Sequence, residues 1–211
     1  MLALAAVAAS SALLGVAVPA RAVSCPDVGI IFARGTGEPP GIGRVGQAFA
    51  EALSPLLDGR SLATYPVDYP ASVNFLTTAR GAYDAKDQID TLSEQCPATR
   101  LVLGGFSQGA AVMSMLAGVA PVGSRIGNMG SAPPLPPKST GKVAAVAVFG
   151  NPAVRFGTPL STSGLFVGRA IDLCSDGDPI CTSGGRDRQA HNNYDMPPYN
   201  EEAAAFVAAL L

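Results

Sequence analysis

The chain has 211 residues, of which 48% are hydrophobic, and a formal net charge of -2 with 14% charged residues. This length and apolar content suit one substantial hydrophobic core, and they argue against a disordered chain. The sequence has no basic patch or run of like charge, which argues against nucleic acid as a partner.

The first predicted feature is an apolar segment over residues 1–22, which carries no charge before Arg21. It ends in the small-residue pattern Ala20-Arg21-Ala22, which is typical of a signal-peptide cleavage site. We therefore expect a secretory signal peptide, a secreted or cell-envelope location, and one domain over residues 23–211. The alternative is an uncleaved anchor, since the segment approaches the length of a membrane span.

Strand and helix patterns then alternate along the chain. Short apolar runs predict five strands, and helical spacing of apolar residues predicts a helix after most of them. Such alternation predicts an α/β fold with a mainly parallel sheet between two layers of helices and no lid domain. The expected strands are Val28–Ala33, 62–67, Arg100–Phe106, Val143–Phe149 and 166–173; the helices are 45–57, 73–92, 110–119 and 201–211; and 123–142, with its SAPPLPP motif, is a loop.

The four cysteines indicate two disulfide bonds, because their number is even and the chain is expected to be exported. Three pairings are possible. The short spacing between Cys174 and Cys181 favours a local bridge, which leaves Cys25 to pair with Cys96. We expect no metal site, because zinc sites use histidines and His191 is the only one in the chain.

A serine lies between glycines in the segment Gly105-Phe106-Ser107-Gln108-Gly109. A predicted strand precedes it and a predicted helix follows, which is the context of the G-x-S-x-G nucleophile turn. Side chains at the two glycine positions would collide in so sharp a turn. A glycine-rich turn without catalytic function is the alternative, but this context favours Ser107 as a nucleophile.

A serine hydroxyl needs a base, and His191 is the only histidine that could serve. The acid that orients the base lies between the serine and the histidine in this type of hydrolase. A bridge between Cys174 and Cys181 would hold a loop carboxylate in place, which favours two of the aspartates in that interval. The spacing does not separate those two. The candidates are Asp172, Asp176, Asp178 and Asp187, and the two favoured ones are Asp176 and Asp178.

Three segments resemble the cutinase family of serine esterases. CSDGDPIC is similar to the family segment C-x-x-G-D-x-[VI]-C, GGFSQGA to its nucleophile segment, and IIFARGTGE to its first-strand segment. They occur in the family order, and together with the cysteines they extend the likeness over residues 25–211. The chain is most similar to the cutinase-like proteins of actinobacteria.

The resemblance implies a three-layer α/β-hydrolase fold and a role for each candidate residue. It implies a triad in which Asp178, and not Asp176, is the acid. It also implies that two backbone N–H groups and a hydroxyl form an oxyanion hole. The implied residues are Ser107, His191 and Asp178 for the triad, Thr36 and Gln108 for the oxyanion hole, and Cys25–Cys96 and Cys174–Cys181 for the disulfides.

The activity that the resemblance implies is hydrolysis of carboxylic esters through an acyl-enzyme, with no cofactor. Short to medium acyl esters, lipids and cutin-like polyesters are the expected substrates of a monomer that makes transient contact with lipid surfaces, and a phospholipase of the same fold is the alternative. Arg186 and Arg188 stand where plant-cutin enzymes carry apolar residues, which argues against cutin. The two arginines either face solvent or meet anionic head groups.

Two readings from other classes compete with an esterase. The segment Gly41-Ile-Gly43-Arg-Val-Gly46 is a literal G-x-G-x-x-G, which is typical of dinucleotide-binding oxidoreductases. It does not directly follow the first predicted strand, because Gly35 to Pro40 intervene, so NAD binding is the weaker hypothesis. A catalytically silent surface-binding module is the other reading, and the complete set of triad residues weakens it.

Overall fold

A computed structural model describes residues 24–123 and 129–211. The expected signal peptide, residues 1–22, lies outside the described residues. Five strands form one sheet in the order β2-β1-β3-β4-β5, and all four neighbouring pairs are parallel, which confirms the predicted sheet. The strands are β1 (Val28–Ala33), β2 (Leu62–Pro66), β3 (Arg100–Phe106), β4 (Val143–Phe149) and β5 (Ala170–Leu173).

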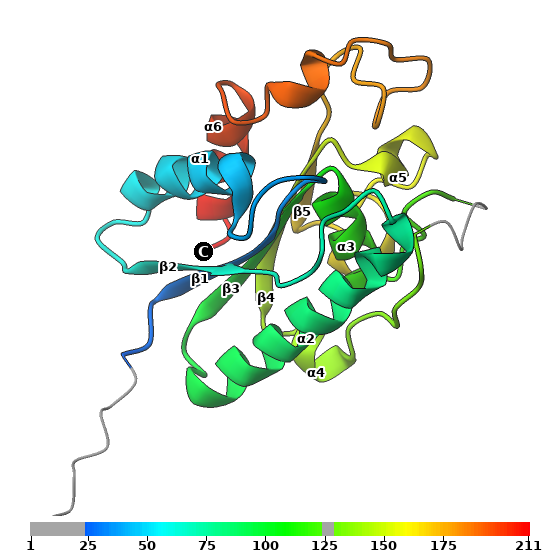
Figure 1. The fold of residues 1–211 in the computed structure, drawn as a ribbon. Helices are drawn as coiled ribbons and strands as arrows, with labels where there is room; N and C mark the ends of the chain where they lie inside the picture. Colours follow the sequence, from blue (N-terminus) through cyan, green and yellow to red (C-terminus); the bar gives the residue numbers. More distant parts are fainter. Residues whose placement is uncertain (1–23, 124–128) are drawn as a thin grey trace, which may run out of the picture.

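Helices cover both faces of the sheet, so the architecture has three layers (Figure 1). One face packs against α1 and α6, and the other against α2, α3 and the short helix α5, with α4 beside α2. The helices are α1 (Gly43–Leu53), α2 (Thr78–Gln95), α3 (Gln108–Leu116), α4 (Pro137–Thr140), α5 (Pro152–Arg155) and α6 (Tyr199–Ala208).

The two-residue period of the strands explains why the core has two halves. In β1, Ile30 and Phe32 join the cluster under α1 and α6, whereas Ile31 and Ala33 join the cluster under α2 and α3. Both faces of the sheet are buried, which is why its strands are continuously apolar in the sequence. Every residue of α3 is buried as well, as its lack of a polar side predicts.

Several predicted boundaries were wrong. The strand expected over 166–173 is only Ala170–Leu173, because a 3-10 helix occupies Gly164–Phe166 and Gly168 turns the chain at a φ of +82°. The loop expected over 123–142 contains α4, which begins with a proline at a position that needs no N–H donor.

The helix expected over 73–92 begins only at Thr78, and only some of the apolar residues in that range are buried. Val73, Leu76 and Tyr83 are exposed, whereas Ile89 and Leu92 are buried against the sheet. The segment before Thr78 forms a 3-10 turn beside the carboxyl end of the sheet instead of a turn of α2.

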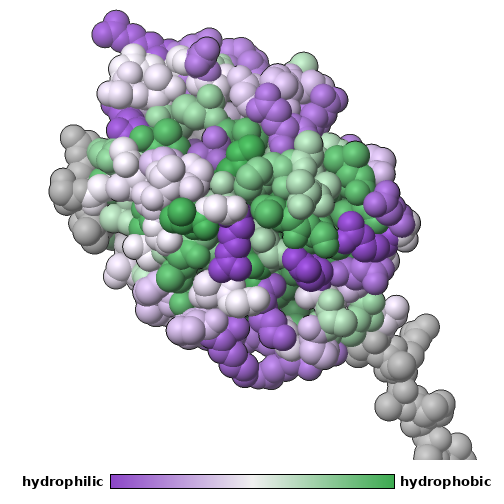
Figure 2. Space-filling model, turned by 180° about the vertical axis from the view of Figure 1, so that it is seen from behind, coloured by the Kyte–Doolittle hydropathy of each residue, from purple (hydrophilic) through white to green (hydrophobic). Residues whose placement is uncertain are grey.

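Apolar residues also reach the surface. The face seen from behind carries patches of hydrophobic residues between hydrophilic ones (Figure 2). Within residues 24–123 and 129–211, the helices are too short or too polar for any of them to traverse a bilayer. The hydrophobic residues that remain exposed include Val73, Phe75, Leu76 and Phe156.

Candidate active site

Ser107 lies between the end of β3 and the first residue of α3, at the carboxyl edge of the sheet. Its backbone has a φ of +53°, a left-handed conformation that costs about 1–3 kcal/mol for a residue with a side chain. A Cβ at Gly105 would overlap the carbonyl of Gly109, and one at Gly109 would overlap the carbonyl of Ala33. The two glycines therefore permit the sharp turn that exposes the serine hydroxyl.

His191 and Asp178 complete a hydrogen-bonded chain with Ser107. His191 Nε2 lies 2.9 Å from Ser107 Oγ, and His191 Nδ1 lies 2.8 Å from Asp178 Oδ2. An ionised carboxylate only accepts hydrogen bonds, so Asp178 selects the tautomer in which Nδ1 carries the proton. Nε2 is then free to accept the proton of the serine hydroxyl. In this arrangement the imidazole of His191 can act as a base toward the Ser107 hydroxyl, and the carboxylate of Asp178 orients the imidazole.

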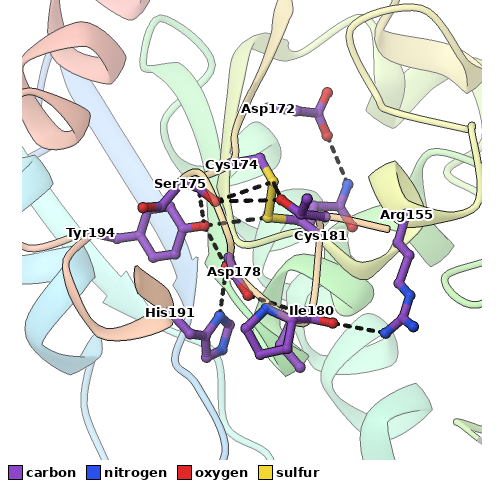
Figure 3. The surroundings of a disulfide bond; sticks show 12 residues. Arg155, Asp172, Cys174, Ser175, Asp178, Ile180, Cys181, His191 and Tyr194 are labelled. Carbon is purple, nitrogen blue, oxygen red and sulfur yellow. Dashed lines mark hydrogen bonds and ion pairs between the residues drawn. A yellow bond between two sulfur atoms is a disulfide. The ribbon is translucent and has the colours of Figure 1, made fainter. Parts of the chain in front are cut away.

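Asp178 is fully buried and is surrounded by donors (Figure 3). Its Oδ2 accepts from the Tyr194 hydroxyl at 2.5 Å as well as from His191, and its Oδ1 accepts from the Ile180 N–H at 2.7 Å. Burial raises the pKa of Asp178, but the hydrogen bonds from His191, Tyr194 and Ile180 outweigh it and hold the pKa below its usual value. The carboxylate is therefore charged at neutral pH.

The loop that carries Asp178 is closed by the disulfide between Cys174 and Cys181 (Figure 3). A second disulfide joins Cys25 to Cys96. Within the closed loop, the Asp178 N–H donates to the Ser175 carbonyl at 3.0 Å. The short bridge thus limits the movement of the carboxylate opposite His191.

The other aspartates lie elsewhere. Asp176 is exposed and is not brought to His191. Asp172 lies in β5, where it accepts from the Asn151 amide and the Ser161 N–H. Asp187 accepts from two backbone N–H groups just before the 3-10 turn of His191. Of the four candidates, only Asp178 meets the base.

Tyr194 is a residue of this site that the sequence analysis missed. It is fully buried, and its hydroxyl accepts from the Ser175 N–H at 2.9 Å while donating to Asp178. Burial, and next the hydrogen bond to Asp178, raise the pKa of Tyr194, so the hydroxyl keeps its proton. The only signal in the sequence was an aromatic residue within the polar segment RDRQAHNNYD.

We expect Tyr194→Phe to lower the free energy of unfolding by about 1.5–3 kcal/mol at neutral pH, since a buried hydrogen bond to a charged group is lost. The pKa of Asp178 is depressed in the folded state, so its stabilising effect is present above about pH 4 and is lost as the pH falls further. The difference between variant and wild type should therefore shrink below pH 4. Urea unfolding at pH 7 and pH 3 measures it.

The control for this prediction is Tyr199→Phe, because Tyr199 donates to the Ser175 hydroxyl at 2.8 Å and not to a carboxylate. The effect of Tyr199→Phe on the free energy of unfolding should therefore be the same at pH 7 and pH 3. A Tyr194→Phe variant with the same loss of stability at both pH values would contradict the role given to the hydrogen bond with Asp178.

Thr36 and Gln108, the two residues expected to form an oxyanion hole, lie side by side next to Ser107. The Thr36 hydroxyl donates to the Gln108 side-chain oxygen at 2.9 Å, and the Gln108 amide donates to the Thr78 hydroxyl at 2.9 Å. Gln108 is the first residue of α3, where backbone N–H groups have no acceptor within the helix. Such a position suits an anion.

The loop that carries Thr36 is held by Glu38, which the sequence analysis did not single out. The Glu38 carboxylate accepts from the Gly35 N–H at 2.6 Å and from the Arg44 N–H at 3.0 Å. The buried Arg34 side chain donates to the Glu38 carbonyl and to the carbonyls of Val67 and Tyr69. Thr36 therefore lies on a loop whose backbone is fixed on both sides.

The G-x-G-x-x-G segment lies at the start of α1 and faces this loop. Nine residues separate the end of β1 at Ala33 from the start of α1 at Gly43, whereas in a dinucleotide-binding fold the glycines form the turn directly after the strand. Gly43 has a φ of +70°, and a Cβ there would meet the Glu38 carboxylate. Gly43 thus allows α1 to approach the Thr36 loop, Gly46 leaves room for the Phe32 ring of β1, and Gly41 has a φ of +136° in open space.

Arg44, within the same segment, connects α1 to the loop of His191. Its guanidinium pairs with Asp195 at 2.5 Å, donates to the Asn192 carbonyl at 2.9 Å and lies over the Phe106 ring. The Phe106 ring in turn packs against the imidazole of His191, with 5.0 Å between the ring centroids. The start of α1 therefore supports both the Thr36 loop and the His191 loop.

An apolar cavity of about 350 Å³ opens beside Ser107. Its polar side chains are those of Ser107, Thr36 and Gln108, and the other lining side chains are apolar, which suits the acyl part of an ester. Arg186 and Arg188 are exposed and do not line it. The other lining residues are Phe75, Val122, Met129, Pro152, Phe156 and Ile180.

Comparison with known proteins shows the family to which the chain is similar. The sequence model of the family Cutinase matches residues 24–211. The chain is 47% identical to the phospholipase Culp4 of Mycobacterium tuberculosis, over 97% of this chain and 88% of that protein. It is 50% identical to the probable carboxylesterase Culp3 of the same species, over 91% and 72%.

A solved structure with a similar fold and sequence is the Trichoderma reesei cutinase in complex with a phosphonate inhibitor. The TM-score is 0.65 and the identity 34%, and the match covers 88% of this chain and 77% of that one.

Proposed function

The chain belongs to the cutinase family and is a carboxylic ester hydrolase, and on that basis we propose that Ser107, His191 and Asp178 carry out the reaction. The observation that supports this assignment is the continuous hydrogen-bonded chain between the three side chains, with 2.9 Å and 2.8 Å between its members. These residues are far apart in the sequence, and their alignment serves no evident packing purpose.

In the proposed mechanism, Ser107 Oγ attacks the ester carbonyl while His191 Nε2 takes its proton, and Asp178 stabilises the imidazolium that forms. The backbone N–H groups of Gln108 and Thr36 donate to the oxyanion, each lowering the barrier by roughly 3 kcal/mol. The Thr36 hydroxyl, which donates to the Gln108 side-chain oxygen in the free protein, turns to the oxyanion when it forms. His191 next protonates the leaving alcohol. Water, activated by the same imidazole, then hydrolyses the acyl-enzyme and restores Ser107.

The substrates we propose are esters of short to medium acyl chains and lipids, because the cavity beside Ser107 is lined mainly by hydrocarbon. Phospholipids are a second candidate class, favoured by the similarity to the phospholipase Culp4. Cutin-like polyesters are less suited, since the chain between Cys181 and His191 carries the exposed Arg186 and Arg188.

A p-nitrophenyl alkylphosphonate tests the nucleophile directly, since Ser107 Oγ would displace p-nitrophenolate and remain bonded to phosphorus. We expect one equivalent of p-nitrophenolate, complete inactivation, and a mass increase confined to the peptide that contains Ser107. Ser114, which is buried seven residues further along α3, is the internal control and should stay unmodified. Labelling at another residue would contradict the assignment.

We further propose that the protein acts outside the cytoplasm as a monomer that meets lipid surfaces transiently. The two disulfide bonds support an oxidising compartment. Phe75 lines the cavity, and Val73 and Leu76 are exposed hydrophobic residues of the same segment, which supports contact with a lipid surface.

A further inference from the structure

A second apolar cavity, of about 230 Å³, lies next to the one beside Ser107. The residues that follow α3 form one side of it, and the beginning of the SAPPLPP loop forms the other. Its walls include Met115, Val119, Pro121, Ala132 and Pro134, which are all apolar. The loop that the sequence analysis left without a role is therefore a cavity wall.

Among the described residues, the two cavities share only Val122 and Met129. Met129 is 8% exposed and belongs to the hydrophobic cluster under α2 and α3, and Val122 packs against that cluster. Methionine is unbranched and has three rotatable side-chain bonds, so it adapts to irregular spaces more readily than a branched side chain. The residues common to both cavities are thus apolar, and one of them has an adaptable side chain.

We propose that the second cavity is a binding site for the distal part of a long acyl chain, which passes Met129 while its ester group stays at Ser107. The inference rests on the proposed function. The first cavity contains Ser107 and has Met129 in its wall, so a chain too long for it meets Met129. Beyond Met129 the acyl chain enters a space lined mainly by apolar side chains instead of water. Burial of each further methylene group there is favourable.

The proposal makes Met129 and Ala132 determinants of chain length. Ala132 lines the second cavity and not the first, and it is partly buried against the core. Ala132→Phe fills the second cavity and leaves the first as it is. Met129→Ala removes most of a side chain that lines both cavities, so it should have the opposite effect on long chains.

The test compares kcat/KM for p-nitrophenyl butyrate and p-nitrophenyl dodecanoate at a fixed detergent concentration. We expect Ala132→Phe to lower the dodecanoate-to-butyrate ratio by about fourfold for each methylene it excludes. Met129→Ala should raise the ratio. The control is Ala98→Phe, the same substitution at an exposed turn before β3, which should leave the ratio unchanged.

An unchanged ratio in both Ala132→Phe and Met129→Ala, with butyrate hydrolysis intact and dependent on Ser107, would overturn this inference and leave the proposed function standing. If Ala132→Phe does not fold, an unchanged ratio in Met129→Ala overturns it alone. Absence of butyrate hydrolysis in the wild type, or full activity in Ser107→Ala, would instead overturn the proposed function and this inference with it.

Discussion

Ser107→Ala should reduce kcat for a short p-nitrophenyl ester by about 10⁵- to 10⁶-fold, since removal of a catalytic serine hydroxyl abolishes the acyl-enzyme route. The backbone turn should survive the change, because Gly105 and Gly109, which permit the close contacts around it, remain. Steady-state release of p-nitrophenolate measures the loss, and circular dichroism confirms the fold.

The matched control is Ser114→Ala. Ser114 lies in the same helix, and its hydroxyl donates to the Ala110 carbonyl and to the Asn151 side chain. This variant should lose some stability and keep its kcat. Comparable kcat values for Ser107→Ala and Ser114→Ala would show that Ser107 is not the nucleophile.

Asp178→Asn should reduce kcat by about 10⁴-fold with little change in KM, because it reverses the polarity opposite His191. Oδ1 of the new amide can still accept from the Ile180 N–H. The amide nitrogen then replaces Oδ2, which accepts from both His191 Nδ1 and the Tyr194 hydroxyl. The new amide nitrogen is a donor and would face two other donors, His191 Nδ1–H and the Tyr194 hydroxyl. His191 would therefore favour the tautomer with the proton on Nε2, which cannot accept the proton of Ser107.

The control is Asp176→Asn, two residues away in the same disulfide-closed loop. Asp176 is exposed, and its substitution should leave kcat unchanged. Since the spacing in the sequence does not separate these two aspartates, the pair of variants also tests the resemblance that favours Asp178. Loss of kcat in Asp176→Asn with normal kcat in Asp178→Asn would reverse the assignment.

The fold and two of the triad candidates followed from local properties of the sequence. Continuous apolar runs predict buried parallel strands, and the structure confirms five of them in one parallel sheet. Ser107 was found from the glycines that its turn requires, and His191 from being the only histidine. The ends of elements were predicted less well, as at β5. An apolar run looks the same in the sequence whether it forms one long strand or a 3-10 turn followed by a short strand.

Interactions between distant segments had no such local signal. Tyr194 reaches Asp178 from 16 residues away, and Arg44 reaches the Asn192 carbonyl in the His191 loop from 148 residues away. Their side chains are ordinary in the sequence, and only the packing of α1 and the closed loop against the sheet places them there.

The sequence by itself determined the chemistry that is available: one serine on a sharp turn, one histidine, a few loop aspartates and enough apolar residues for an α/β core. Spacing in the sequence left two aspartates open and the family resemblance favoured Asp178, but only the tertiary structure shows that carboxylate buried against the imidazole. Only the tertiary structure shows which residues hold the Thr36 loop and which residues line the two cavities. The reason is physical. Periodicity and turn chemistry act between neighbours in the chain, whereas burial, hydrogen bonding and cavity shape depend on segments that meet only after folding.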